Sequence, residues 1–423
     1  MTYAVLTLGC KLNQTGSAEL AGRLGGAANE LKVEQADLIF LNTCTVTHRA
    51  DREARRLARA VRRANPRAKV VVMGCAARRD PAMFRKMPEV DAVLCSSEEE
   101  RAFLEAHVTE NTSGLCLPHF SDRTRAFLKV QDGCDFACSY CIIPAVRGRS
   151  RSVPEEQVVR TFSSFLEAGY KEVVLTGVNT GEYGKDLGRR EGLQGLLERL
   201  LSLPGSFRIR LNSVEPRAVT DGLRGLLRDE PRLCRHLQIP LQSGSDAVLK
   251  DMRRNYRSGF YEDLIHRLAL EIPGIGLGAD VLVGFPTESR EDFEATLALI
   301  ERAPLAFVHA FPFSPRPGTP AAELAGLPPV EVSARSAALR ALGAAKAAAF
   351  SGAMAGSEMQ ALTLISGGGC GRALTDNFLD VELSDPVPAN RFVRVRVEKL
   401  MPGGVAGRVV QGSDESPGEE ATA

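Results

Sequence analysis

The chain is organised around one stretch, Val130-Gln131-Asp132-Gly133-Cys134-Asp135-Phe136-Ala137-Cys138-Ser139-Tyr140-Cys141-Ile142-Ile143-Pro144. It places three cysteines at C-x3-C-x2-C spacing, directly after an apolar run that predicts a strand entering a loop. Three thiolates on so short a loop must converge on one metal centre. Because iron–sulfur clusters are normally held by four cysteine thiolates, a loop of three indicates a cluster with one iron open to another ligand. We call Cys134, Cys138 and Cys141 the loop trio.

Two simpler interpretations of the loop trio are a zinc site and free buried cysteines. Zinc sites usually use C-x2-C pairs and need a fourth ligand nearby. The sequence has no histidine between Ser121 and Gln157, which disfavours a local site of three cysteines and one histidine. The cluster interpretation therefore leads, with zinc as the alternative.

Length and composition indicate a globular protein of several domains. The 423 residues are enough for two or three domains at roughly 100–200 residues each. With 53 basic and 52 acidic residues, the net charge is +1, so a polyanionic partner must be met by a local patch. Ten cysteines in a large chain without a secretory leader favour metal-binding thiols in a reducing cytoplasm. No run approaches the roughly 20 apolar residues that a membrane span needs, so no membrane partner is expected.

Three apolar runs within residues 1–120 each end in a cysteine, and helix-like stretches separate them. This alternation predicts an N-terminal open parallel α/β sheet. Loops after the carboxyl ends of parallel strands fall on one edge of the sheet, so these cysteines can meet there and form a second open cluster site. We call Cys10, Cys44 and Cys75 the strand-end trio. The alternative is three small buried residues, as cysteine often is. Cys95 also follows an apolar run, but acidic Glu98-Glu99-Glu100 makes a poor setting for anionic thiolates.

Residues 121–351 continue the alternation of strands and helices. Six strands are predicted, at 126–130, 172–175, 207–211, 236–241, 275–283 and 306–313, with helices between them and a connector helix over 331–351. They favour a partial (β/α)6 barrel whose strand ends form one mouth. Those ends are rich in glycine, which lets a ligand approach the backbone closely, and in amides and carboxylates. Each alone would be an ordinary turn. Together, on the same edge as an open iron, they favour a nucleoside-bearing cofactor.

Two basic stretches are candidate contacts with a phosphate backbone. Arginines at 49, 52, 56, 59 and 63 follow steps of three and four and share one helix face, with apolar residues opposite. A charge run is usually a solvated face, but the shortage of acids nearby makes phosphate contact the competing interpretation. Arg147-Gly148-Arg149-Ser150-Arg151 follows the loop trio and could steer a phosphate backbone or simply precede a helix.

The C-terminal part changes character. Residues 359–365, 372–383 and 392–397 alternate as short strands parted by glycine and proline, which predicts a small β-barrel over residues 352–412. Such barrels commonly hold nucleic acid, and Arg394 and Arg396 share one strand face. The acidic tail, residues 413–423, is expected to be disordered.

With all parts in hand, the chain resembles the methylthiotransferases of the radical S-adenosylmethionine (SAM) superfamily over nearly its whole length. The loop trio with Tyr140 before its last cysteine, the N-terminal three-cysteine domain and a C-terminal TRAM-like barrel occur in the family's order. Two further stretches, Leu8-Gly9-Cys10-Lys11-Leu12-Asn13-Gln14 and His309-Ala310-Phe311-Pro312-Phe313-Ser314-Pro315-Arg316-Pro317-Gly318-Thr319, are similar to the branch that acts on threonylcarbamoyladenosine. The chain departs from that branch at Ala145-Val146 and Ala76-Ala77-Arg78.

The resemblance implies a cytoplasmic enzyme that converts N6-threonylcarbamoyladenosine at position 37 of tRNA to its 2-methylthio form. It implies two [4Fe–4S] clusters, one on each trio, two SAM molecules per turnover, the tRNA anticodon loop as partner, and an electron donor and a sulfur source. Siblings that modify isopentenyladenosine or a ribosomal-protein aspartate remain alternatives. A further alternative, which is not an enzyme, is a non-catalytic metal-containing RNA-binding protein.

Positions that match the family supply the candidate SAM contacts, and the basic stretches and the C-terminal barrel supply the candidate RNA contacts. No side chain is expected to act as a catalytic acid or base, because the cofactors carry the chemistry. The candidate SAM contacts are Tyr140, Gly177, Asn179, Ser213, Glu215, Gln242 and Asp280. The candidate RNA contacts are Arg52, Arg56, Arg59, Arg63, Arg147, Arg149, Arg372 and Arg394.

Overall fold

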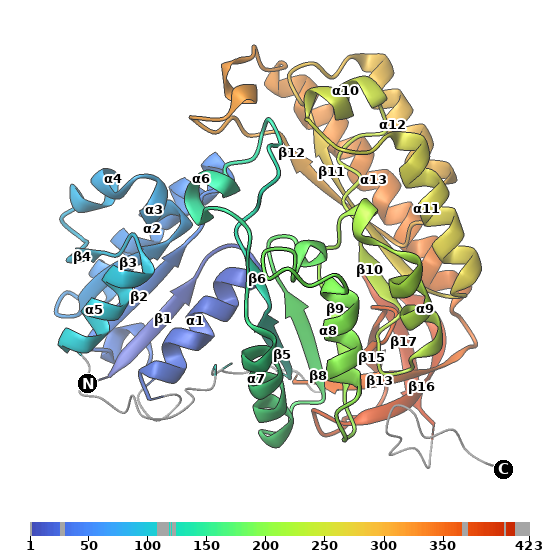
Figure 1. Ribbon diagram of the computed structural model, residues 1–423, viewed down its shortest axis with the longest axis horizontal. Helices are drawn as coiled ribbons and strands as arrows, with labels where there is room; N and C mark the ends of the chain where they lie inside the picture. Colours follow the sequence, from blue (N-terminus) through green and yellow to red (C-terminus); the bar gives the residue numbers. More distant parts are fainter. Residues whose placement is uncertain are drawn as a thin grey trace. The chain divides into compact units, whose positions relative to one another are not determined.

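The computed structural model describes residues 2–25, 30–107, 118, 120, 124–365, 371–401 and 403–410 (Figure 1). They form two compact units, and each unit is made of several separate segments of the chain. The first unit comprises Met1–Ser121, Gly133–Ser150 and Ser314–Ala322, and the second comprises Asp122–Asp132, Arg151–Phe313 and Glu323–Ala423. Both cysteine trios therefore belong to the first unit. The domain boundaries expected from the sequence stay a prediction, and the acidic tail lies outside the described residues.

The first unit is built on a four-stranded parallel sheet of order β1-β2-β3-β4. This confirms the open parallel α/β sheet predicted for the N-terminal part. Its strands are β1 (Tyr3–Thr7), β2 (Leu38–Thr43), β3 (Lys69–Gly74) and β4 (Ala92–Val93). Its helices are α1 (Lys11–Arg23), η2 (Val33–Gln35), α2 (His48–Ala64), α3 (Cys75–Arg79), α4 (Pro81–Arg85), α5 (Ser97–His107) and α6 (Ile143–Arg147).

Alternating side chains of the central strands bury both faces of this sheet. Leu38 and Phe40 of β2 pack with the apolar residues of α1 and α5. Ile39 and Leu41 pack on the other face, with Ala54 and the rest of the apolar stripe of α2. A strand buried on both faces is locked in register, because a slip by one residue would exchange the two sets of side chains.

The second unit contains six parallel strands in two hydrogen-bonded groups, β5-β8-β9 and β10-β11-β12. Isolated parallel bridges, Ile209 to Leu233 and Ser213 to Gln238, join the groups edge to edge. The strands are β5 (Arg125–Lys129), β8 (Glu172–Thr176), β9 (Arg208–Leu211), β10 (His236–Gln238), β11 (Gly276–Val283) and β12 (Phe307–Pro312), and a short antiparallel pair is formed by β6 (Gln131–Asp132) and β7 (Arg151–Ser152). The predicted partial barrel is confirmed.

One strand of the partial barrel is shorter than its apolar run predicted. β10 ends at Gln238 rather than at residue 241. Hydrogen bonds to β11 nevertheless continue, because the N–H groups of Ile239 and Leu241 donate to the carbonyls of Gly278 and Asp280. Gln242 takes a positive φ of 63° and forms an isolated bridge with Val281, so the regular pairing is interrupted while the run stays along β11.

Helices separate the strands of the partial barrel. They are α7 (Glu155–Glu167), η3 (Thr180–Glu182), α8 (Gly192–Leu201), η4 (Pro216–Ala218), α9 (Asp221–Asp229), α10 (Asp246–Asp251), α11 (Ser258–Glu271), α12 (Arg290–Arg302), η5 (Pro320–Glu323) and the connector α13 (Pro329–Ala353). In the described part of the chain, no helix combines the length and the apolar character needed to cross a membrane.

The C-terminal strands close into a barrel of order β13-β14-β15-β17-β16, as predicted. Its strands are β13 (Glu358–Leu364), β14 (Gly371–Thr375), β15 (Asp380–Leu383), β16 (Phe392–Met401) and β17 (Gly404–Val409). The stretch 372–383, treated as one strand in the sequence, is two strands around a turn in which Phe378 takes a positive φ of 73°. The sequence also missed β17, because two glycines interrupt its weak apolar pattern.

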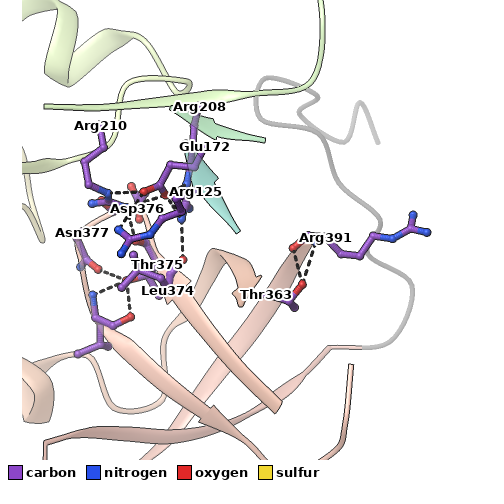
Figure 2. A network of polar contacts seen from close by, with 11 residues as sticks. Arg125, Glu172, Arg208, Arg210, Thr363, Leu374, Thr375, Asp376, Asn377 and Arg391 are labelled. Carbon is purple, nitrogen blue, oxygen red and sulfur yellow. Dashed lines mark hydrogen bonds and ion pairs between the residues drawn. The ribbon is translucent and has the colours of Figure 1, made fainter. Parts of the chain in front are cut away.

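A buried ion-pair network holds the C-terminal barrel to the partial barrel within the second unit (Figure 2). Arg125, Glu172 and Arg208 stand level on the neighbouring strands β5, β8 and β9. Glu172, which is 0% exposed, pairs with Arg208 and Arg210 through their Nε atoms at 2.7 and 2.9 Å. The same guanidiniums donate to the carbonyls of Leu374, Thr375 and Asp376 in the β14–β15 turn.

We expect Glu172→Gln to lower the free energy of unfolding by about 3–5 kcal/mol, because it leaves buried arginines without their counter-charge. Chemical denaturation measures this loss. Glu294→Gln is the control, since Glu294 pairs with Arg290 on the exposed face of α12 and should contribute little. Equal losses in the two variants would contradict the assignment.

The contribution of Glu172 should also depend on pH. Burial alone would raise its pKa, but the charges of Arg210, Arg208 and Arg125 outweigh burial and hold the pKa well below its usual range. A lowered folded-state pKa gives stability that is complete above the unfolded-state pKa, about 4.3, and declines as the pH falls below it. The stability difference between wild type and Glu172→Gln should therefore shrink from about pH 4 downward.

Candidate functional site

The strand-end trio lies at the carboxyl ends of three adjacent strands. Cys10 follows β1 and caps α1, Cys44 directly follows β2, and Cys75 follows β3 as the first residue of α3. The parallel register sets Thr7 beside Asn42 and Thr43 beside Gly74, which brings these ends level. The three thiols lie close enough that the charges of Cys75 and Cys10 both raise the pKa of Cys44.

Burial makes two members of the strand-end trio, Cys44 and Cys75, unfavourable as free thiolates, whereas Cys10 is exposed. Burial raises the pKa of Cys44 to about 11, although a hydrogen bond from the Val46 backbone opposes the rise. Burial also raises the pKa of Cys75, and the Arg147 guanidinium opposes that rise by its charge and by a hydrogen bond. Thiols that stay protonated on their own can still bind a metal, because the metal displaces their protons. Several sulfur ligands that converge on one place therefore fit a metal centre.

A glycine and an asparagine shape the pocket of the strand-end trio. Gly9 has a φ of 104°, and a Cβ added to it would stand 2.7 Å from the Cβ of Cys44. The buried Asn13 amide donates to the carbonyls of Leu8 and Thr43 at 2.8 and 3.1 Å. Its Oδ1 lies 4.0 Å from the Sγ of Cys75. Asn13 thus ties together the loops that carry all three cysteines.

Within the described ranges, no three His, Cys, Asp or Glu side chains are grouped closely enough to hold a single metal ion. The ligands of a four-iron cluster bind separate irons, so they stand farther apart than the ligands of one ion. A group arranged around a single ion is therefore not the arrangement that the ligands of a four-iron cluster require.

The loop trio lies on a turn closed by backbone hydrogen bonds. The N–H of Cys134 donates to Gly148 at 3.1 Å, and that of Cys141 donates to Cys138 at 3.2 Å. Gly133 has a φ of 73°, and a Cβ there would stand 2.0 Å from the Arg149 carbonyl oxygen, so the turn requires glycine. None of the three cysteines is in a disulfide, and all three are partly accessible.

The two trios are joined inside the first unit. Cys75 packs with Ile142 and Val146, which directly follow the loop trio. Arg147, at the end of α6, donates to the Oδ1 of Asn13 and lowers the pKa of Cys75. A cation from the loop-trio segment therefore stands at the strand-end trio. By contrast, Cys95 lies beside Glu99 and Arg85.

The strand ends of the second unit carry a buried amide with no hydrogen-bond partner. Asn179 is 3% exposed, and among the described residues neither polar atom of its side chain is bonded. Its backbone N–H is fixed by the Gln131 side chain at 2.9 Å. A Cβ on Gly177 would stand 2.9 Å from the Oε1 of Gln131, so the residue there must be small. Buried polar groups are normally hydrogen-bonded, so this amide offers one donor group and one acceptor to a polar ligand.

Carboxylates from several segments of the partial barrel gather around Glu215. Burial raises the pKa of Glu215, its ion pair with Arg254 opposes the rise, and the charges of Glu182 and Asp280 add to it. Asp280 accepts from Gln238 at 2.8 Å and lies 3.3 Å from the Nδ1 of His309. The arrangement offers several acceptors to an amino group or a ribose diol.

The other candidate SAM residues are placed as follows. The Ser213 carbonyl accepts from Thr180 at 2.8 Å, and the backbone of Gln242 bonds to Asp280 and Leu282. These residues belong to the second unit with Gly177, Asn179, Glu215 and Asp280, whereas Tyr140 belongs to the first. A SAM contact by any of them stays a prediction.

The candidate RNA residues differ in their surroundings. Arg52, Arg56, Arg59 and Arg63 are all exposed on α2. Four candidates form ion pairs, namely Arg56 with Glu53, Arg59 with Glu89, Arg149 with Asp135 and Arg372 with Asp380. Arg394 is exposed on β16. Arg147 is the exception, because it is half-buried beside Asn13. RNA contact by these residues stays a prediction.

Sequence reasoning missed Asn13, Gln238 and His309 as site residues. Asn13 and His309 lie within the stretches that carry the family resemblance, which was the available signal. Gln238 was hidden inside an apolar run, where a single amide suggests only a strand position.

Family models cover two parts of the chain. Residues 2–95 match the uncharacterized protein family UPF0004, and residues 128–300 match the radical SAM superfamily. The fold is also similar to a solved structure of the radical SAM methyltransferase TsrM from Kitasatospora setae. That likeness has a TM-score of 0.53 at 16% identity and covers 76% of this chain and 77% of that one, so it speaks for the fold alone.

Curated relatives extend the match to whole proteins. A threonylcarbamoyladenosine tRNA methylthiotransferase MtaB from Bacillus subtilis is 37% identical, over 76% of each chain. Another MtaB, from Aquifex aeolicus, is 33% identical over 94% of this chain and 100% of its own. A tRNA-2-methylthio-N(6)-dimethylallyladenosine synthase from Acidothermus cellulolyticus is 34% identical over 96% and 84%.

The match of residues 128–300, which include the loop trio, shows that the chain is a radical SAM enzyme. More narrowly, the chain belongs to the MtaB-type methylthiotransferase family. Membership implies a [4Fe–4S] cluster and SAM as cofactors. It leaves the non-catalytic RNA-binding alternative without support.

We expect Gly9→Ala to displace Cys44 and to cost about four irons per chain after anaerobic reconstitution. Gly169→Ala is the matched control, because Gly169 also has a positive φ, 87°, but has open space around it. Both variants carry a similar backbone strain, about 1–2 kcal/mol, so only the contact with Cys44 distinguishes them. Equal iron contents in the two variants would show that the Gly9 cradle does not shape the site.

Proposed function

We propose that this enzyme converts N6-threonylcarbamoyladenosine at position 37 of tRNA to 2-methylthio-N6-threonylcarbamoyladenosine. The observation that carries the proposal is the similarity to MtaB from Aquifex aeolicus, which is 33% identical over 94% of this chain and 100% of its own. The convergence of the strand-end trio supports it, because sulfur transfer requires a second site beyond the one on the loop trio.

Each trio would hold one [4Fe–4S] cluster. The cluster with SAM supplies the activation of the inert C2–H bond of adenine, which no acid or base side chain could attack. The chain's own groups bind and orient. Gly9 and Asn13 shape the strand-end trio, and Arg147 adds a cation beside its sulfur atoms. One SAM would be cleaved and a second would supply the methyl group.

The strand ends of the second unit would bind SAM. The unpaired amide of Asn179 supports this most directly, with Gly177 admitting the ligand to the backbone. Glu215 and Asp280 would accept from its amino group or ribose, with Ser213 and Gln242 beside them. Tyr140 would contribute from the loop trio.

The tRNA anticodon loop would be bound through the basic residues. Arg52 and Arg63 support this, since both are exposed on α2 and neither has an acidic partner among the described residues. Arg56, Arg59, Arg149, Arg372 and Arg394 would add contacts. An electron donor and a sulfur source are further proposed partners. None of the eight described cysteines is in a disulfide, which supports a reducing cytoplasm as the location.

A second candidate substrate is isopentenyladenosine in tRNA. The Acidothermus cellulolyticus relative, named for the dimethylallyladenosine product, matches 96% of this chain at 34% identity. The ribosomal-protein aspartate remains a third possibility without such an observation.

The function is tested by offering the reconstituted enzyme, SAM and a reductant two tRNAs, one with threonylcarbamoyladenosine and one with isopentenyladenosine. We expect methylthio mass on the first nucleoside only. Wild type should bind about eight irons, and each triple Cys→Ala variant about four. The loop-trio variant should lose SAM cleavage, whereas the strand-end-trio variant should cleave SAM without forming product. Product from the strand-end-trio variant would remove the second site from the reaction.

We expect Asn179→Ala to weaken SAM binding about tenfold, the effect of losing one hydrogen bond to a charged ligand. The measurement is equilibrium binding of SAM to reconstituted protein under anaerobic conditions. Asn212→Ala is the control, because Asn212 also follows a strand but donates to the Thr176 hydroxyl at 3.3 Å. Unchanged affinity in Asn179→Ala, with iron content intact, would contradict the assignment.

A further inference from the structure

The segment Ser314–Ala322 belongs to the first unit although it lies far along the chain from the rest of that unit. It is not part of either trio. A turn shapes it, in which the backbone N–H and the hydroxyl of Thr319 both donate to the Arg316 carbonyl, at 3.0 and 2.8 Å. This turn sends the two ends of the segment toward different neighbours.

One end of the segment contacts the loop after Cys44. The backbone N–H of His48 donates to the Ser314 hydroxyl at 3.0 Å. The guanidinium of Arg316 donates to the Thr45 hydroxyl at 2.9 Å and to Asp51 at 2.6 Å. Arg316 is 1% exposed, so this ion pair is shielded from water.

Asp51 gathers the elements that carry two of the strand-end cysteines. It is buried, and it also accepts from the Thr45 hydroxyl, next to Cys44, at 2.6 Å. It pairs with Arg79 at 3.2 Å, and Arg79 is the last residue of the helix that begins at Cys75. The loop after Cys44, the helix after Cys75 and Arg316 therefore meet at one carboxylate.

The other end of the segment contacts the loop trio. The backbone N–H of Ala321 donates to the carbonyl of Ser139 at 2.8 Å. Ser139 lies between Cys138 and Cys141 and is buried. A stretch of six residues, from Arg316 to Ala321, thus spans the two cysteine sites through directional contacts at each end.

Arg316 occupies a position that is costly to fill. Within the described ranges, its Nε and Nη1 have no hydrogen-bond partner, although both are buried. Burying unpaired donors is unfavourable. A smaller or apolar residue would avoid that cost, so the guanidinium is required for the contacts that it does make, with Thr45 and Asp51.

We propose that Arg316 is a positioning residue, which with Asp51 and the Ala321–Ser139 bond fixes the separation of the strand-end trio from the loop trio. The inference rests on the proposed two-cluster function. Group transfer between two sites depends steeply on their separation, since a misplacement of about 1 Å costs on the order of 100-fold in rate. Arg316 does not itself contact the cysteines of either trio. Its replacement should therefore change the separation between the two trios and leave each trio able to bind its cluster.

The test compares Arg316→Gln, Arg316→Lys and wild type as anaerobically reconstituted full chains. The first readout is the magnetic coupling between the two reduced clusters, which weakens with the cube of their separation. We expect Arg316→Gln to keep about eight irons but to show altered coupling, and Arg316→Lys to restore part of it. The second readout is product yield, which should fall about 10- to 100-fold while SAM cleavage stays within about twofold.

Two further variants separate positioning from general stability. Arg224→Gln is the matched control, because Arg224 is a largely buried arginine paired with Glu271 at 2.8 Å in the second unit. It should leave the coupling unchanged. Ala321→Pro removes the N–H that bonds to Ser139 and should alter the coupling in the same way as Arg316→Gln, even if Arg316→Gln folds poorly.

The outcomes distinguish this inference from the proposed function. About four irons and no cluster coupling in wild type would defeat the two-cluster function itself. About eight irons in wild type, with wild-type coupling in both Arg316→Gln and Ala321→Pro, would overturn the positioning role alone. Loss of iron from one trio in Arg316→Gln would also overturn it, because Arg316 would then support that site and not the gap.

Discussion

The parallel pairing of β1, β2 and β3 is the constraint on which the candidate site depends. It brings three cysteines that are far apart in sequence to one edge of a sheet, at positions level with one another. The register is fixed by burial on both faces, since Leu38 and Phe40 serve one core and Ile39 and Leu41 the other. The spacing of the sulfur atoms is therefore set by hydrophobic packing well below them in the sheet.

Two buried carboxylates add long-range connections that packing alone would not specify. Glu172 stands at the amino ends of the partial-barrel strands and joins them to the C-terminal barrel (Figure 2). Asp51 stands near the cysteines and joins elements of the first unit. A buried charge must be paired and hydrogen-bonded. Each carboxylate therefore admits few arrangements of the segments around it.

The functional groups share one physical property, which is that each is unfavourable without a partner. Cys44 and Cys75 are buried thiols with raised pKa values. Asn179 is a buried amide without a hydrogen bond among the described residues. Such groups cost stability in the isolated chain, and a bound metal centre or polar ligand would relieve that cost.

The sequence by itself determined the strands, the helices between them and the cysteines at their ends, because hydrophobic periodicity and glycine placement are local signals. It predicted both trios, and it missed β17, whose pattern two glycines weaken. Only the tertiary structure decided what the charged residues contact. Arg316 and Asp51 are 265 positions apart, and Arg147 looked like a solvent-facing cation until folding set it beside Asn13. No local sequence pattern predicts which distant residue a charged side chain will pair with. Such pairs form only when distant segments of the chain pack together.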